Sequence, residues 1–316
     1  MPLRPPSAPV VLALVALIAV AVGCGSGATR DGASSGSAGA PAPAPARIEV
    51  VAAENFWGSI AAQLGGDRVD VVDVIASPDT DPHDYEPTPQ DSRTVAQADY
   101  VIANGVGYDP WATKLVDANP VNGRRVLDVG DLVGARPGDN PHRWYFPADV
   151  ERVIDQITAD YQAIDPADAA YFDQQRHDFE TTALAPYHQA LQDIRRRFAG
   201  TPVGASESIF VGLADATGLD LVTPPAYLTA ISEGTDPTAR DKASVDAQIH
   251  DGVVKVFVFN SQNATPDVQA LVDAADAADI PVATITETPP SDGTFQAWQT
   301  GQLEALAAAL ARATGR

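Results

Sequence analysis

Cysteine and basic residues are both scarce in this chain of 316 residues. A single cysteine, Cys24, means that no disulfide can form within the chain. The 20 Lys and Arg face 42 Asp and Glu, so the formal net charge is -22 at pH 7. A surface of that sign repels phosphate backbones, and we expect no nucleic-acid partner. The charge attracts cations only diffusely, so it does not by itself specify a metal site.

The chain also lacks an apolar run long enough to span a bilayer comfortably. The run from Val10 to Val22 follows Arg4 and suits the core of a signal peptide. It ends in small residues directly before Cys24. This pattern predicts a lipoprotein signal over residues 1–24, acylation of Cys24 and anchoring at the outer face of the cell membrane. An ordinary secretory signal with an incidental cysteine is the alternative, because Ala21 stands where leucine is commoner.

Residues 25–47 contain Gly-Ser runs followed by alternating Ala and Pro. They carry too few apolar side chains to offset the entropy that ordering would cost. We therefore predict a disordered tether between the anchor and a folded body.

The remaining chain is long enough for two lobes, because one hydrophobic core rarely organises so many residues. Hydrophobic residues make up 45% of the sequence, which is sufficient for folding. Short β-branched runs alternate with helix-compatible stretches from residue 48 onward. Strands are predicted at 48–53, 69–75 and 100–104, with helices at 55–64 and 89–98. This order predicts an N-terminal α/β lobe, mainly parallel, over residues 48–147.

The same alternation returns after residue 200 and predicts a second α/β lobe over 200–316. Its strands are expected at 203–206, 253–259 and 282–286, and its helices at 210–217, 266–278 and 295–313. Residues 253–259 are nearly all apolar, as expected for a central strand. Residues 148–199 favour a helical connector, in which Pro186 predicts a kink or a break.

Two histidines each follow a proline. His83 lies in the loop 79–89, where three prolines restrict the backbone, and His142 follows Pro141 just before the connector. A neutral imidazole on a stiff loop suits a metal ligand, because ordering the loop beforehand reduces the entropy cost of binding. Each histidine taken alone could equally be a surface turn residue. Two of them in one chain favour a metal site.

These and two further motifs resemble a known family. The motifs are Asp81-Pro82-His83, Asn140-Pro141-His142-Arg143-Trp144, Asn260-Ser261-Gln262 and Thr286-Glu287-Thr288-Pro289. In this order they resemble the zinc/manganese solute-binding proteins of metal ABC transporters, the cluster A-I or ZnuA/TroA-like family. The resemblance covers residues 48–316.

The resemblance implies two α/β lobes joined by a long helical connector, with a metal held in the interlobe cleft. It places the four metal ligands at His83, His142, Glu207 and Glu287. For the two glutamates the alternative is a solvated loop carboxylate. It further implies an exported, monomeric lipoprotein that captures Zn²⁺ or Mn²⁺ and delivers the ion to the permease and ATPase of an importer. The metal is then cargo and no catalytic cofactor is expected.

Three departures from the family pattern bear on the ion. Glu207 replaces the third histidine of typical zinc members, and no histidine-rich acidic loop lies between Asp128 and Asn140. Both favour Mn²⁺, since oxygen donors suit that ion, although intrinsic affinity favours Zn²⁺. Phe146 stands where aspartate is frequent.

Two other functions are compatible with such a scaffold. A surface adhesin or metal buffer would need no transporter, and a zinc hydrolase would need an open coordination position. We expect no enzyme, because the sequence has no His-Glu-x-x-His, Gly-x-Ser-x-Gly or phosphate-loop motif and Glu287 would close the coordination sphere. The other histidines and the large aromatics are assigned to no site: His177, His188, His250, Trp57, Trp111 and Trp144.

Overall fold

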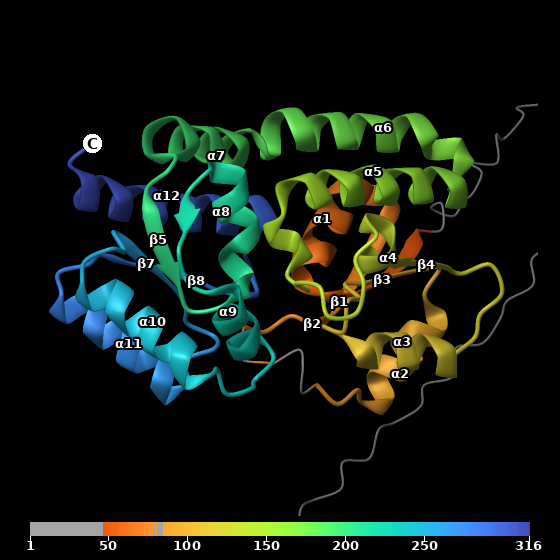
Figure 1. Ribbon diagram of the computed structural model, residues 1–316. Coiled ribbons are helices and arrows are strands. Elements are labelled where there is room, and N and C mark those ends of the chain that lie inside the picture. The colour runs from red at the N-terminus through yellow and green to blue at the C-terminus, as the bar shows by residue number, and fades with distance from the viewer. Residues whose placement is uncertain (1–46, 79, 81–84) are drawn as a thin grey trace, which may run out of the picture. The chain divides into compact units, whose positions relative to one another are not determined.

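The computed structural model describes residues 47–78, 80 and 85–316 (Figure 1). The predicted signal, Cys24, almost all of the tether and His83 lie outside the described residues. All the described residues belong to one compact unit of the chain. None of the helices in these ranges is long and apolar enough to cross a membrane.

The N-terminal lobe is built on a parallel sheet with strand order β2-β1-β3-β4. Its strands are β1 (Ile48–Glu54), β2 (Val69–Ile75), β3 (Tyr100–Ala103) and β4 (Arg125–Asp128). Its helices are α1 (Asn55–Gly65), α2 (Pro89–Gln97), α3 (Pro110–Ala118) and α4 (Val129–Val133), with a 3-10 turn at η1 (Gly66–Arg68). The three predicted strands are confirmed. The edge strand β4 was not predicted.

The C-terminal lobe repeats this plan with strand order β6-β5-β7-β8, again parallel. Its strands are β5 (Pro202–Ala205), β6 (Asp220–Leu221), β7 (Val256–Asn260) and β8 (Val282–Ile285). Its helices are α8 (Val211–Thr217), α9 (Pro225–Ser232), α10 (Ala239–His250), α11 (Pro266–Ala277) and α12 (Phe295–Thr314), and η5 (Ser208–Phe210) is a 3-10 turn. β7 is central as predicted, but it begins three residues later than expected, and Val253, which precedes it, is 44% exposed.

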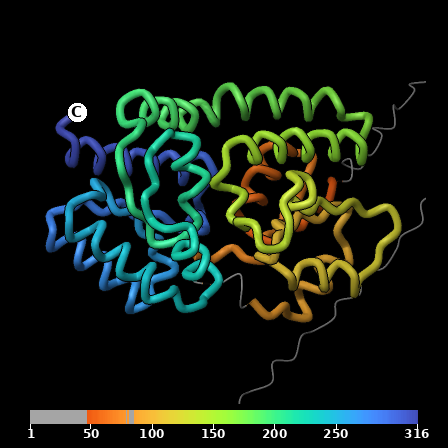
Figure 2. The backbone as a smooth tube through the Cα atoms, viewed as in Figure 1, coloured from red at the N-terminus to blue at the C-terminus, as the bar shows by residue number. Residues whose placement is uncertain are grey.

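Helices connect the lobes. They are α5 (Pro147–Ile164), η3 (Pro166–Asp168), α6 (Ala169–Asp178), the π-helical turn η4 (Phe179–Ala183) and α7 (Ala185–Phe198). The tube in Figure 2 follows this stretch from the helices of the first lobe to those of the second. α6 packs against α1 and α5, whereas α7 packs against α8 and α12. Pro186 lies in the first turn of α7, so the predicted break is confirmed.

Both sheets are covered on both faces, and one hydrophobic cluster runs through the two lobes. Phe56 of α1 stacks on Trp144 with ring centroids 4.0 Å apart, and Phe210 of the second lobe belongs to the same cluster. Trp57 and Trp111 are buried as well, so these three tryptophans belong to the core.

Candidate metal centre

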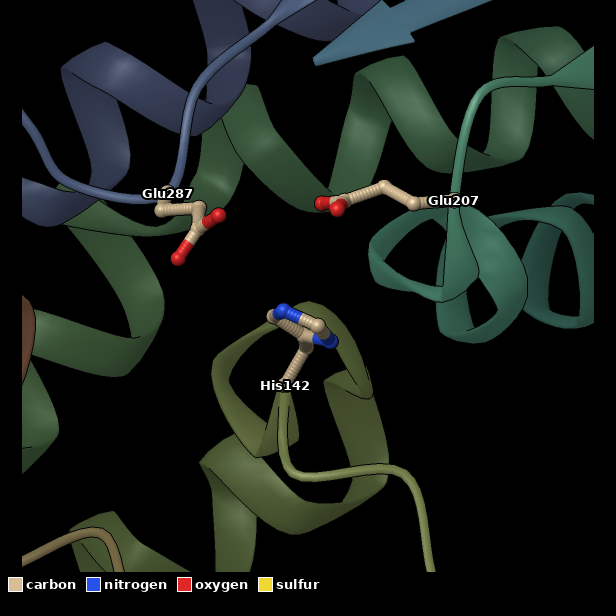
Figure 3. A group of neighbouring side chains, drawn as sticks. All are labelled: His142, Glu207 and Glu287. Carbon is tan, nitrogen blue, oxygen red and sulfur yellow. The ribbon is translucent and has the colours of Figure 1, made fainter. Parts of the chain in front are cut away.

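Three of the four predicted ligands converge in the structure. His142, Glu207 and Glu287 each offer a ligand atom, and these atoms lie within 4.8 Å of one another. Figure 3 shows the three side chains pointing from separate segments toward a common point. All three residues are buried, with exposures of 1%, 1% and 8%. The position of His83 in this site remains a prediction, because that residue lies outside the described ranges.

Sheet topology explains why the two carboxylates meet. Glu207 follows the end of β5 by two residues, and Glu287 follows the end of β8 by two. β5 and β8 lie on either side of β7 in a parallel sheet, so the carboxyl ends of these strands lie together along the same edge of the sheet. That edge is where open α/β sheets bind ligands.

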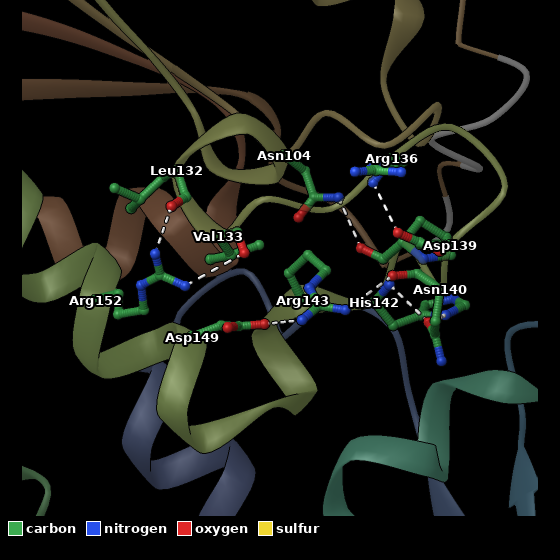
Figure 4. A network of polar contacts seen from close by, with 11 residues as sticks. Asn104, Leu132, Val133, Arg136, Asp139, Asn140, His142, Arg143, Asp149 and Arg152 are labelled. Carbon is green, nitrogen blue, oxygen red and sulfur yellow. Dashed lines mark hydrogen bonds and ion pairs between the residues drawn. The ribbon is translucent and has the colours of Figure 1, made fainter.

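His142 approaches from the other lobe on the loop before η2 (Arg143–Tyr145). Two contacts hold this loop, as Figure 4 shows. The side-chain amide of Asn104, just after β3, donates to the carbonyl of Pro141 over 2.8 Å. Arg143 forms an ion pair with Asp149 of α5. The predicted stiffness of the Pro141-His142 segment therefore comes from tertiary contacts as well as from proline.

Asn140 fixes the tautomer of His142. Its Nδ2 donates to the carbonyl of Ser208 over 2.7 Å, and its Oδ1 accepts the backbone N–H of His142 over 3.0 Å. This orientation places Oδ1 2.9 Å from His142 Nδ1, so Nδ1 must be the protonated nitrogen. Nε2 then carries the lone pair that a metal ligand needs, and the contact to Asn140 orients the ring.

Glu207 is held by two amides. Its Oε1 accepts from Asn260 Nδ2 and its Oε2 from Asn263 Nδ2, each over 2.6 Å. Burial raises the pKa of Glu207 to about 8, and the neighbouring charge of Glu287 adds to the rise, while the two amides oppose it. No salt bridge among the described residues involves Glu207.

Glu287 is oriented from both lobes. Its Oε1 accepts from Asn260 Nδ2 over 2.9 Å, and its Oε2 accepts from the hydroxyl of Tyr108 over 2.9 Å. Burial raises the pKa of Tyr108 well above its ordinary value, so the hydroxyl keeps its proton and remains a donor. The four carboxylate oxygens of the site thus each accept a hydrogen bond from a neutral donor.

This donor set suits a divalent transition metal. It combines an imidazole nitrogen with two carboxylates, a mixture that both Zn²⁺ and Mn²⁺ accept. The site borders a cavity of about 1230 Å³ whose lining includes Asn140, Ser208, Asn263 and Glu287. The two lobes therefore both contribute to the wall of this space.

Sequence reasoning missed the residues that orient the ligands. Asn140 and Asn260 entered only as parts of family motifs, and Tyr108 and Asn263 were not singled out. An asparagine at the end of the predicted central strand was an available signal, because such a residue touches the ends of both neighbouring strands. The unassigned histidines lie elsewhere, on α6, α7 and α10: His177, His188 and His250.

The fold and this site define a two-lobed solute-binding protein. The chain belongs to the family described as zinc-uptake complex component A, periplasmic (ZnuA), whose family model matches residues 50–309. It is 26% identical over 243 residues to the metal ABC transporter substrate-binding lipoprotein FimA of Streptococcus parasanguinis, covering 70% of this chain and 74% of FimA. The same identity and coverage hold for the manganese ABC transporter substrate-binding lipoprotein PsaA of Streptococcus pneumoniae.

Solved structures show the same fold at lower identity. The Mn-bound periplasmic metal-binding protein from Candidatus Liberibacter asiaticus superposes with a TM-score of 0.69 at 18% identity, covering 84% of this chain and 99% of that one. The periplasmic zinc-binding protein TroA from Treponema pallidum gives a TM-score of 0.68 at 17% identity with the same coverage. The predicted architecture of two α/β lobes is confirmed.

Proposed function

We propose that this protein is the extracytoplasmic solute-binding component of an ABC importer. It captures one divalent transition-metal ion, Zn²⁺ or Mn²⁺, and delivers it to a membrane permease that an ATPase drives. The observation that carries this proposal is the burial of His142, Glu207 and Glu287 with ligand atoms within 4.8 Å of one another. Membership of a metal-uptake family supports it.

In this proposal His142 binds the ion through Nε2, Glu207 and Glu287 bind through carboxylate oxygens, and His83 is the fourth ligand. Two carboxylates favour Mn²⁺ more than a set of three imidazoles would, whereas the intrinsic order of affinities favours Zn²⁺. The names of PsaA and of MntA from Halalkalibacterium halodurans, both manganese proteins, support Mn²⁺.

Anchoring through acylated Cys24 is part of the same proposal. Relatives named as lipoproteins support it, as does the small-residue run before that cysteine. A tether over residues 25–47 would keep a monomeric body near its permease.

Native mass spectrometry of the full chain, purified in detergent, tests the metal site. Titration with Mn²⁺ and with Zn²⁺ should give one retained ion per chain. His83→Ala, His142→Ala, Glu207→Gln and Glu287→Gln should each lose most of that occupancy. His250→Ala is the matched control, since His250 is exposed and contacts Asp251. A wild-type chain that retains neither ion would refute the proposed function.

Transport and catalysis have their own readouts. Deletion of the gene should reduce uptake of the bound metal by cells, whereas normal uptake would favour an adhesin or a metal buffer. Hydrolytic turnover by the metal-loaded protein that disappears in His142→Ala would indicate a catalytic zinc site.

A further inference from the structure

We propose that the turn Asn260–Asn263, through the side chains of Asn260, Gln262 and Asn263, sets the metal specificity of the site by fixing the two carboxylates relative to each other and to the other lobe. This inference rests on the proposed function. We call these three residues the amide turn. Each is a positioning residue, and none belongs to the group of His142, Glu207 and Glu287.

Asn260 bridges the two carboxylates. Its Oδ1 accepts the backbone N–H of Gln262 over 3.0 Å, which leaves Nδ2 facing the site. That one NH₂ group donates to Oε1 of Glu207 over 2.6 Å and to Oε1 of Glu287 over 2.9 Å. The residue is completely buried, and its backbone N–H donates to Ser206 Oγ over 3.0 Å. The distance between the two oxygens is therefore set by a single rigid group.

The second oxygen of Glu207 is fixed as well. Asn263 Nδ2 donates to Glu207 Oε2 over 2.6 Å, and this second bond fixes the plane of that carboxylate. Both donors are uncharged, so they orient the carboxylate without neutralising it. An arginine or lysine at either position would hold the carboxylate equally well but would compete with an incoming cation.

Gln262 connects the backbone around Glu287 to the other lobe. Its Oε1 accepts the backbone N–H groups of Glu287 and Thr288, the latter over 3.0 Å. Its Nε2 donates to Thr288 Oγ1 over 3.0 Å and to the carbonyl of Pro78. Pro78 follows β2 in the N-terminal lobe. One carboxamide thus links the backbone of a metal ligand to a loop of the opposite lobe.

A rigid carboxylate pair can discriminate between ions in a way that a mobile pair cannot. If the two carboxylates could move apart or rotate, each ion would bind them in its own preferred coordination geometry. The intrinsic order of affinities, in which Zn²⁺ binds more tightly than Mn²⁺, would then decide which ion is bound. Fixed oxygens hold the pair at one separation and therefore favour the ion that matches it. The amide turn supplies this restraint on three of the four carboxylate oxygens, and the hydroxyl of Tyr108 restrains the fourth.

The test compares the affinities of the full chain and its variants for Mn²⁺ and Zn²⁺ by competition against a chromophoric chelator. Asn260→Ala should weaken Mn²⁺ binding by about 10- to 100-fold, the usual cost of losing a group that orients a ligand. It should weaken Zn²⁺ binding less, so that the ratio of Mn²⁺ to Zn²⁺ affinity falls. Asn119→Ala is the control, because Asn119 bonds to Ser92 and Leu115 far from the site and both affinities should stay unchanged.

Two further variants keep the test decisive if Asn260→Ala does not fold. Asn263→Ala removes the bond to Glu207 Oε2, together with a second bond from Asn263 Nδ2 to the carbonyl of Ile231, and should lower the ratio to a smaller extent. Gln262→Met keeps the length of the side chain and should speed metal release. An equal loss of both affinities, or none, in the folded variants would overturn the inference. A wild-type chain that binds no metal would refute the proposed function instead.

Discussion

The hydroxyl of Tyr108 donates a hydrogen bond to Glu287 Oε2 over 2.9 Å, although the two residues are 179 positions apart in the sequence. Tyr108 follows β3 of the N-terminal lobe and Glu287 follows β8 of the C-terminal lobe. This contact makes the orientation of one proposed ligand depend on the other lobe. In the proposed metal site, a change in the relative position of the lobes would therefore act on the orientation of this carboxylate.

Tyr108→Phe should weaken metal binding by about tenfold, as expected when a bond that orients a ligand is lost. The ring remains, so its contact with Trp144, at a centroid distance of 4.8 Å, is retained. Isothermal titration calorimetry with Mn²⁺ measures the change. Tyr227→Phe, in the separate hydrophobic cluster of the C-terminal lobe, is the control and should bind normally. Equal affinities of Tyr108→Phe and wild type would show that the contact is dispensable.

Asn140→Ala should also reduce metal affinity by about 10- to 100-fold, because the protonated Nδ1 of His142 would lose the acceptor that selects its tautomer. Asn140 also bonds to the backbone of Ser208, so part of the loss would come from the loop. Nitrogen NMR of labelled histidine in the metal-free protein separates the two effects. A change in the tautomer population of His142 is expected, and an unchanged population would contradict this role.

The metal-free protein should lose stability as pH rises. The pKa of Glu207 rises on folding from its ordinary value of 4.5 to about 8, so the folded chain binds more protons than the unfolded chain between these values. The free energy of unfolding then decreases with pH across that window, by at most about 1.4 kcal/mol per pH unit for this one group. The pKa values of Asp73 and Asp109, each raised to about 6, act in the same direction at lower pH.

Urea unfolding in the presence of EDTA from pH 5 to pH 8.5 measures this dependence. The free energy of unfolding of Glu207→Gln should decline less steeply above pH 6, because the amide cannot ionise. A wild-type free energy of unfolding that increases with pH over this range would contradict the conclusion that folding raises the pKa of Glu207.

Metal binding should release a proton at neutral pH. With a pKa of about 8, Glu207 is largely protonated in the metal-free protein at pH 7, and coordination requires its ionised form. Calorimetry in buffers with different ionisation enthalpies should show a larger release of protons at pH 7 than at pH 9.5. Below about pH 6 protonation of histidine should weaken binding further. A release that does not change with pH would exclude Glu207 as its source.

Sequence periodicity was sufficient for most of the fold. The predicted strands β1, β2, β3 and β7 carry dense β-branched or apolar runs, and each is present. β4 and β6 were missed, because β6 has two residues and Val126 of β4 is 49% exposed at the sheet edge. Edge strands of this kind carry little of the hydrophobic pattern on which such predictions rest.

The sequence indicated the candidate ligands but hardly any of their surroundings. Glu207 and Glu287 were placed by family resemblance, and the structure brings both beside His142. The contacts of Asn260 join residues 53 and 27 positions away. Such contacts depend on which strands are neighbours and in which register, and neither can be read from local periodicity.

Because Asn260 is the last residue of β7, the site is sensitive to deletions within that strand. Successive side chains of a strand point to opposite faces, so removing one residue from β7 would turn that carboxamide away from both acids or shift the whole strand against β5 and β8. Lengthening the loop between α10 and β7 would leave the strand end in place. The length of the chain therefore matters most along the five residues of β7, which end at the proposed metal site.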